Sequence, residues 1–320
     1  MISKEIVKRA VTRTGPPRMP LLYFNEFIEK SDIIRTSYGS AKNFVPDDPN
    51  RSEWGFRWER LDDTMGQPTN PPIADWDMLT QYRPPDANAP GRFDHMADFV
   101  RRNNTKYLIG ELGISGLNLV TFLRGFAETM EDLYLEPERM MALIHMVYDF
   151  EIGIIEGFCR YDIDAVSFSD DLGTQQSLML APDMWRKVFK PLYKKQFDIV
   201  HSHGKDVYFH SCGYVYPIIQ DLIDIGVDVF NFNQPDLLGI DHLNRDFGGK
   251  VSFACPVDHQ TVAITGTREE IFGYVRHLKD TLGAHNGGLI GYIEEYSSVG
   301  MKPESFASIC EAFETIGSEQ

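Results

Sequence analysis

The chain has 320 residues, a hydrophobic content of 42% and a formal net charge of −16. Proteins that bind nucleic acid usually present a basic face, so this acidic balance argues against a nucleic-acid partner. No run approaches the ~20 apolar residues of a membrane-spanning helix, and the N-terminal MISKEIVKRAVTRTG lacks the apolar segment of a signal peptide. We therefore expect a cytoplasmic protein with no membrane contact, whose four cysteines are free thiols.

Two apolar segments near the N-terminus, at residues 18–27 and 31–38, are expected to form strands. The composition then changes, because residues 46–90 hold eight of the 18 prolines and three of the four tryptophans. Proline breaks helices, and a solvated linker rarely carries so many aromatic side chains. This stretch therefore predicts an elaborated segment of loops and hairpins.

From residue 105 onward, short apolar runs alternate with longer segments of helical periodicity. The expected strands are 107–112, 164–171, 206–212, 228–233, 251–256 and 288–295, and the expected helices lie near 136–160, 182–203, 214–225, 239–247, 268–284 and 303–317. Together with the two earlier strands, this pattern predicts a parallel (β/α)8 barrel of the TIM type. It would span residues 1–320 as a single domain, with the elaboration at 40–95 near the barrel mouth. A doubly wound open sheet is the alternative, but no glycine-rich phosphate loop follows any expected strand.

Polar residues gather where the expected strands end. They are Glu111, Ser169, Asp170, Asp171, His210, Cys212, Asn231, Asn233, Gln234, Cys255, Asp258, Glu294 and Glu295. Catalytic groups of (β/α)8 barrels lie at the carboxyl ends of the strands. Any one of these residues could be a helix cap or a solvated loop end, but six converging sets predict an active site on this face.

The sequence FHSCG at 209–213 places a histidine and a cysteine two positions apart. Alternate residues of a strand point to the same side, so His210 and Cys212 would aim at one point, and Gly213 would let the chain turn. Imidazole and thiolate are zinc ligands, and a catalytic zinc site needs a third protein ligand. Another strand end would supply it, with Glu295, Glu294 and Cys255 as candidates. The alternative is a core histidine beside a buried thiol.

The segments DDLGTQQSLMLAPDMWRKVFKPLYKK, HSHGKDVYFHSCGYVYPIIQDLIDIGVDVFNFNQP and PVDHQ resemble the uroporphyrinogen decarboxylase superfamily, and within it the branch of corrinoid-protein-dependent methyltransferases. The resemblance implies a TIM-type barrel and a zinc ion held by a His-x-Cys pair and a later cysteine near the last strand. His210 and Cys212 match the pair, whereas the later cysteine falls on Glu295, nine positions before Glu304. A carboxylate therefore replaces a thiolate in the implied ligand set.

The resemblance implies transfer of a methyl group from a small methylated substrate to the cobalt of a separate corrinoid protein. An aromatic lid over the pocket would favour a methoxylated aromatic compound, which is the best guess for the donor. Methylated amines, methanol and thiols stay open as donors, as does the reverse transfer from the corrinoid to a thiol. Asp170 and Asp171 would orient a ligand histidine or protonate the departing oxygen, or else cap a helix. Glu111 is a third candidate catalytic carboxylate. A homodimer is compatible with this function.

The candidate substrate contacts are Trp54, Trp58, Asn231, Asn233 and Gln234. Trp54, Phe56, Trp58 and Met65 would form an aromatic lid over the pocket, or would pack the elaboration against the barrel. Two alternatives to methyl transfer stay open, a cofactorless decarboxylase and a non-catalytic small-molecule-binding barrel. The decarboxylase is disfavoured because a porphyrinogen carries many carboxylates, and the segment after the first strand, YFNEFIEKSDIIR, offers only Lys30 and Arg35 as cations.

Overall fold

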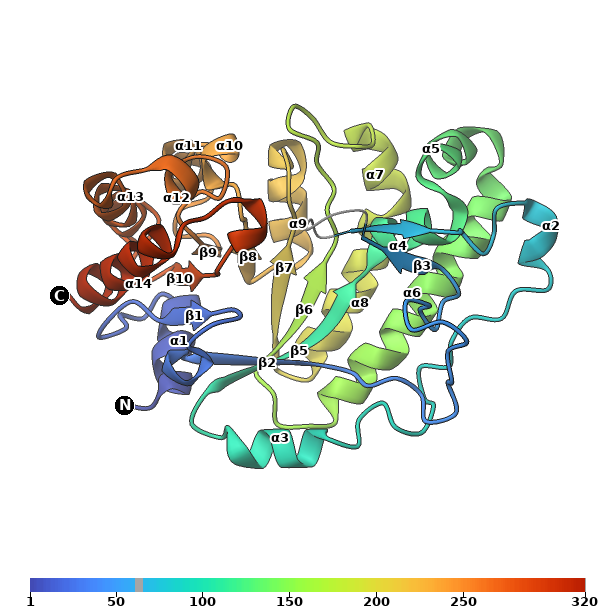
Figure 1. Ribbon diagram of the computed structural model, residues 1–320, viewed down its shortest axis with the longest axis horizontal. Coiled ribbons are helices and arrows are strands. Elements are labelled where there is room, and N and C mark those ends of the chain that lie inside the picture. The colour runs from blue at the N-terminus through green and yellow to red at the C-terminus, as the bar shows by residue number, and fades with distance from the viewer. Residues whose placement is uncertain (61–65, 320) are drawn as a thin grey trace.

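The computed structural model describes residues 1–60 and 66–319. Eight parallel strands form one curved sheet in the order β1-β10-β9-β8-β7-β6-β5-β2 (Figure 1). The strands are β1 (Leu21–Tyr23), β2 (Ile33–Ser37), β5 (Tyr107–Ile114), β6 (Ala165–Ser169), β7 (Asp206–His210), β8 (Val229–Asn231), β9 (Ser252–Cys255) and β10 (Leu289–Ile293). Each of them lies on a strand expected from the sequence, so the predicted α/β barrel of the TIM type is confirmed.

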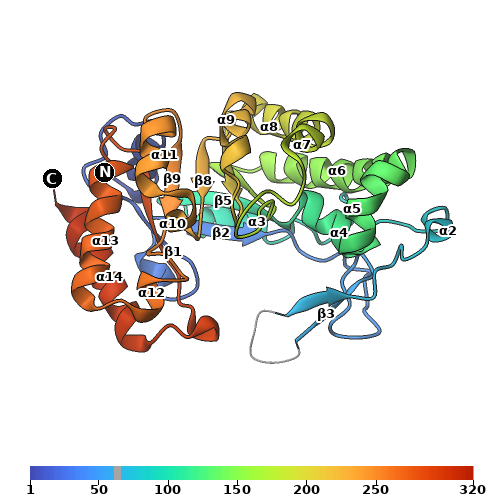
Figure 2. The ribbon, with the colours of Figure 1, turned by 90° about the horizontal axis from the view of Figure 1, so that it is seen from above.

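Helices surround this sheet. They are α1 (Ser3–Val11), α2 (Trp76–Leu79), α3 (Met96–Arg102), α4 (Gly116–Arg124), α5 (Phe126–Leu135), α6 (Pro137–Cys159), α7 (Pro182–Val188), α8 (Lys190–Ser202), α9 (Ile219–Ile225), α10 (Pro235–Leu238), α11 (Ile240–Phe247), α12 (Val262–Thr265), α13 (Arg268–Thr281) and α14 (Pro303–Ser318). Figures 1 and 2 place α13 and α14 at one end of the molecule with both chain termini, and α4 to α8 at the other. None of the helices in the described part of the chain is long and apolar enough to cross a bilayer.

The barrel closes between β1 and β2 without a regular strand ladder. The amide of Asp32 donates to the carbonyl of Leu21 at 2.8 Å, and the Asp32 carboxylate accepts from the Leu21 amide at 2.9 Å. The Ser31 hydroxyl accepts from the Tyr23 amide at 3.1 Å. Arg18 holds the Asp32 carboxylate through two hydrogen bonds of 2.6 and 2.7 Å. This seam (residues 21–23 and 31–33) therefore depends on side chains that substitute for missing backbone partners.

Two layers of apolar side chains make up the core. Every second strand residue points into the barrel, as Ile109, Tyr208, Ala254 and Ile290 do, and α1 adds Val7 to this inner cluster. The intervening residues point outward and pack against the helices, as Phe209 does. The short uninterrupted apolar runs in the sequence reflect this burial of the strands on both faces.

The predicted elaboration contains an antiparallel hairpin of β3 (Arg57–Glu59) and β4 (Gln67–Thr69). Figure 2 shows β3 standing off from the body of the molecule, on the side away from α8 and α9. Nearer the barrel, Arg92 is 1% exposed and donates to the carbonyls of Gly39 and Asp86, both at 3.1 Å, and to the Glu53 carboxylate. A buried guanidinium thus ties three parts of the segment together, since each of its donors needs a partner.

Candidate metal centre

His210, Cys212 and Asp171 converge at the carboxyl ends of two neighbouring strands. His210 ends β7 and Cys212 lies two residues further, while Asp171 follows β6. The Nε2 atom of His210 lies 3.6 Å from the Sγ atom of Cys212 and 3.5 Å from Oδ1 of Asp171. The three ligand atoms lie within 4.8 Å of one another and could hold a metal ion.

The backbone around this group explains why the three side chains meet. The amide of Cys212 donates to Oδ1 of Asp171 at 2.7 Å, so the loops that follow β6 and β7 are joined directly. Gly213 has φ of +81°, and a Cβ atom there would overlap the backbone of Gly173. Only glycine allows both the left-handed turn and the close approach of the two loops. The amide of Gly213 donates to Oε1 of Gln234 at 3.0 Å, which fixes the turn from the β8 side.

Asn231 sets the tautomer of His210. The Asn231 Nδ2 group donates to the carbonyl of Ala254 at 2.9 Å, so its Oδ1 atom is the one that faces Nδ1 of His210, at 2.8 Å. Nδ1 must therefore carry the proton, and Nε2 presents its lone pair toward Cys212 and Asp171. An oriented imidazole of this kind is typical of a metal ligand.

The Cys212 thiol lies in an environment that favours its neutral form. Burial raises its pKa well above the ordinary value, and the Asp171 and Glu294 carboxylates raise it further. A metal binds the thiolate rather than the thiol. Metal binding at this position would therefore release a proton and would offset the unfavourable proximity of Asp171.

The three residues proposed as the third ligand lie outside this group. Glu295 accepts from the Ser297 hydroxyl at 3.1 Å, and its backbone amide donates to Asn25 at 3.0 Å. Glu294 accepts from the Tyr292 hydroxyl at 2.6 Å and from Tyr296. Cys255 is fully buried in the core, and burial raises its pKa to about 12. Among the described residues, Asp171 is the one that completes a group with His210 and Cys212.

Asp170 has a different position from Asp171, although the two are adjacent in sequence. Its carboxylate accepts from the amides of Leu117 and Asn118, each at 2.9 Å, and from the Tyr193 hydroxyl. These amides belong to the first turn of α4, where backbone donors lack helical partners. Burial raises the pKa of Asp170 to about 7. Asp170 thus caps α4, which is the helix-capping alternative that the sequence left open.

Glu111 and Arg35 form an ion pair inside the barrel mouth. Their Oε1 and Nη1 atoms lie 2.6 Å apart, and the guanidinium carbon of Arg35 lies 3.6 Å from the centre of the Phe24 ring. Burial raises the pKa of Glu111, and the positive charge and hydrogen bond of Arg35 partly counter that effect.

The remaining expected substrate contacts separate into two groups. Asn233 lies near the centre, where its Nδ2 group donates to the Tyr296 hydroxyl at 3.0 Å. Trp54 and Trp58 instead contact outer helices: Trp54 packs edge-on against Phe150 of α6 at 4.9 Å, and Trp58 lies 5.9 Å from Phe122 of α4.

Phe56 also packs on Phe122, at 5.4 Å, and Met65 lies outside the described residues. The rings of Trp54, Phe56 and Trp58 therefore pack the elaboration against the helices, as in the second of the two arrangements expected from the sequence, and do not form a lid.

His259 is a residue of the site that the sequence analysis did not single out. Its ring lies 3.8 Å from the Tyr296 ring, centre to centre. Burial lowers its pKa to about 3, so the imidazole is neutral. The signal was present in PVDHQ, which follows β9, because a histidine four residues after the end of an apolar strand lies at the catalytic face of a barrel.

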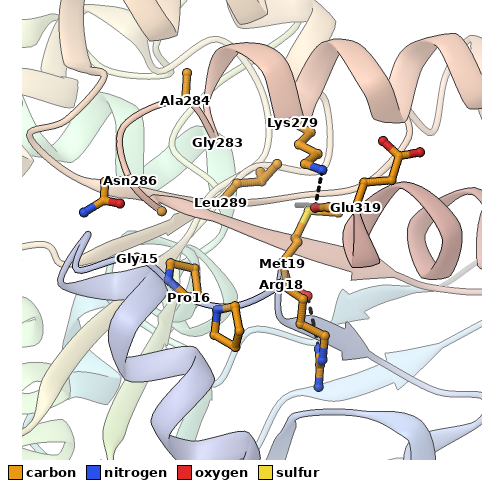
Figure 3. Close-up of a pocket in the computed structure, with 12 residues that line it drawn as sticks. Gly15, Pro16, Arg18, Met19, Lys279, Gly283, Ala284, Asn286, Leu289 and Glu319 are labelled. Carbon is orange, nitrogen blue, oxygen red and sulfur yellow. Dashed lines mark hydrogen bonds between the residues drawn. The ribbon is translucent and has the colours of Figure 1, made fainter. Parts of the chain in front are cut away.

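A cavity of about 450 Å³ lies elsewhere, at the amino ends of the strands. The loop from Gly15 to Met19 and the end of α13 line it (Figure 3). Its charged groups already have partners, since Lys279 donates to the carbonyl of Glu319 at 2.8 Å and Arg18 pairs with Asp32 at 2.6 Å. None of the candidate site residues lines this cavity, so it is separate from the metal centre.

Comparisons with known proteins agree with the fold. The family model described as uroporphyrinogen decarboxylase (URO-D) matches residues 55–294. A solved methyltransferase from Methanosarcina mazei superposes with a TM-score of 0.69 and 11% identity, covering 98% of this chain and 99% of that one. No curated protein matches the chain.

Two solved xylanases are more distant. Xylanase XynB from Paenibacillus barcinonensis has a TM-score of 0.41 at 11% identity, covering 71% of this chain and 82% of its own. An endo-β-1,4-xylanase from Gloeophyllum trabeum has a TM-score of 0.39 at 14% identity, covering 69% and 79%. Neither carries a functional argument.

Proposed function

Because the chain belongs to the uroporphyrinogen decarboxylase family, we propose that it is a zinc-dependent methyltransferase. It transfers a methyl group from a small methylated donor, a methoxylated aromatic compound in the first instance, to the cobalt of a separate corrinoid protein. The observation that carries this proposal is the convergence of His210, Cys212 and Asp171 at the catalytic face of the barrel. The likeness in fold to the methyltransferase from Methanosarcina mazei is consistent with it.

The chemistry of the three side chains fits zinc. Imidazole, thiolate and carboxylate all bind Zn²⁺ at roughly 2.0–2.3 Å, and tetrahedral ligands at those lengths lie roughly 3.3–3.8 Å apart. The Nε2–Sγ and Nε2–Oδ1 distances, 3.6 and 3.5 Å, fall in that interval. Three protein ligands leave one position for substrate, which is typical of a catalytic zinc site.

Each residue of the centre has a defined task in the proposed reaction. When bound, zinc acts as a Lewis acid toward the oxygen that keeps the bonding electrons after the methyl group leaves. Asn231 holds His210 in the tautomer that presents Nε2. The Cys212 amide fixes Asp171 in place. Asp170 anchors the start of α4 and thereby the segment that leads into Asp171.

The electrostatic lining of the mouth favours this reaction over decarboxylation of a porphyrinogen. A substrate with many carboxylates requires several cationic side chains. Here Arg35 is already paired with Glu111 at 2.6 Å, and Glu294 and Asp171 add further negative charge around His210. A polycarboxylate would meet repulsion at this centre.

Zinc analysis tests the ligand set. We expect about one zinc ion per chain in the purified protein, and loss of that zinc in His210→Ala and Asp171→Asn. Glu295→Gln is the matched control, since it changes a carboxylate that hydrogen-bonds Ser297 instead. Retention of zinc in Asp171→Asn and its loss in Glu295→Gln would return Glu295 to the ligand set and exclude Asp171.

Methyl transfer is tested with reduced corrinoid protein and a panel of methoxylated aromatic compounds. Formation of methylcobalt changes the visible absorbance of the corrinoid and should require zinc. The reaction should stop on addition of a chelator and in Cys212→Ala. A zinc-loaded protein that transfers no methyl group from any donor of the panel would rule out the proposed reaction with this donor class.

A further inference from the structure

The side chains around His210 carry an excess of negative charge. Asp171 lies 3.5 Å from its Nε2 atom, and Glu111 of β5 lies in register with Tyr208 of β7 through Ser167 of β6. Glu294 is linked to His210 through the hydrogen bonds of Tyr296, Asn233 and Asn231. The positive charge of Arg35 lowers the pKa of both glutamates, against the larger effect of their burial. The formal charge of the three carboxylates and Arg35 is −2, which a divalent metal would neutralise before the Cys212 thiolate is counted.

Arg35 is not available to an incoming anion. Its Nη1 atom is 2.6 Å from Glu111, and its guanidinium plane is held over the Phe24 ring at 3.6 Å. A substrate carboxylate that bound Arg35 would have to displace Glu111. That displacement would leave a largely buried carboxylate without its partner, which is costly.

Tyr208 offers a hydrogen bond to an uncharged group. It lies two residues before His210 on the same side of β7, is 4% exposed, and its hydroxyl has no hydrogen-bond partner among the described residues. Tyr208 belongs to the cluster of side chains inside the barrel, together with Tyr292 and Phe24. Phe24 lies under the Arg35 guanidinium and Tyr292 donates to Glu294, so the hydroxyl is on the same side of the sheet as these charges. Buried polar groups normally have partners, and a substrate hydroxyl would supply the one that is missing.

We propose that the methyl donor is an uncharged methoxyphenol rather than a methoxybenzoate, with its methoxy oxygen at the metal centre and its free hydroxyl directed toward Tyr208. This inference rests on the proposed methyltransferase function and specifies its substrate class. Phe24 packs against Tyr292 at 5.7 Å, and Tyr292 and Tyr296 both donate to Glu294, so three aromatic rings lie together beside this carboxylate and suit a ring-bearing donor. Charge, not size, is what excludes the carboxylated compound.

The test compares guaiacol, which is an uncharged methoxyphenol, with vanillate, which adds one carboxylate to the same ring. For the native protein we expect kcat/KM for guaiacol to exceed that for vanillate by about tenfold or more, as repulsion at one unbalanced charge predicts. Glu111→Gln keeps a hydrogen-bond acceptor for Arg35 but removes the competing charge, so it should raise kcat/KM for vanillate by about tenfold. Glu304→Gln, a change of an exposed carboxylate in the first turn of α14, should leave the ratio unchanged.

Tyr208→Phe separates the hydroxyl from the charge. It should lower kcat/KM for guaiacol several-fold and leave kcat/KM for anisole, which has no free hydroxyl, unchanged. Equal or better use of vanillate by the native protein would overturn the inference, as would a Glu111→Gln variant with an unchanged ratio.

Isothermal titration with guaiacol and vanillate reports the same preference without any corrinoid. A binding preference for guaiacol without methyl transfer would refute the proposed function alone. Methyl transfer without a charge preference would refute this inference alone.

Discussion

Glu151 of α6 carries a buried carboxylate whose ionisation opposes folding. It is 2% exposed, its Oε1 accepts from the Gly116 amide at 2.7 Å, and its Oε2 accepts from Nε2 of Gln196 at 2.6 Å. Burial raises its pKa from 4.5 to about 7, although both hydrogen bonds favour the ionised form. The folded state therefore holds this proton more tightly than the unfolded chain does.

The sign of the pH effect follows from this difference. Between pH 4.5 and pH 7 the folded protein binds more protons at Glu151 than the unfolded chain, so the contribution of Glu151 to stability falls as pH rises and is constant above pH 7. Each pKa unit corresponds to about 1.4 kcal/mol, so the loss is about 3 kcal/mol at pH 8.

Glu151→Gln should recover most of that loss. The neutral amide has the same shape, and its Oε1 can still accept from Gly116. Gln196 can accommodate the new amide group by rotating, because its own Oε1 atom has no partner among the described side-chain and backbone groups. We therefore expect the variant to be more stable than the native protein by about 3 kcal/mol at pH 8 and nearly equal to it at pH 4.5.

Urea denaturation of both proteins at pH 5 and pH 8 measures this difference. Glu156→Gln, which changes an exposed carboxylate on the same helix, is the control and should be neutral at both pH values. If the Glu151→Gln and native proteins lose stability in parallel between pH 5 and pH 8, the reasoning about burial at this position is refuted.

Three further predictions concern the centre and the segment beside it. Asn231→Ala should lower zinc affinity about 10- to 100-fold, because His210 loses the acceptor that fixes its tautomer, and competition with a chelating dye measures this. Gly213→Ala should destabilise the fold by about 2 kcal/mol or more in thermal unfolding, since φ is +81°, whereas Gly273→Ala, where a Cβ atom meets nothing within 4 Å, should stabilise α13 by about 1 kcal/mol. Trp54→Ala should lower the free energy of unfolding by about 3–5 kcal/mol in urea denaturation, because the ring is buried against Phe150. An unchanged free energy of unfolding would favour the aromatic lid instead.

The sequence predicts the barrel well because its strands are buried on both faces. Such strands are short uninterrupted apolar runs, and all eight were recognisable from that pattern. The seam between β1 and β2 was not predictable, because it depends on the carboxylate of Asp32 and the hydroxyl of Ser31 taking the place of backbone partners. The pattern of apolar residues does not indicate where a side chain takes the place of a backbone hydrogen-bond partner.

The candidate site was predicted in part. Alternation within β7 is a local rule, so the common direction of His210 and Cys212 followed from two positions in the sequence. The third member of the group depends on how the loops after β6 and β7 meet, and a count along the chain led to Glu295 while the geometry brings in Asp171. Asp170 and Asp171 look equivalent in sequence, but the strand end turns their side chains toward different neighbours.

The placement of the seam has a consequence for assembly. β6 and β7 lie in the middle of the strand order, whereas β1 and β2 are its two ends. The three candidate ligand atoms therefore come from 42 consecutive residues, 171–212, and from two strands that pair with each other. The loops of the candidate metal centre are separated from the seam by β5 on one side and by β8, β9 and β10 on the other, so a loosening of the seam would leave the pairing of β6 with β7 intact.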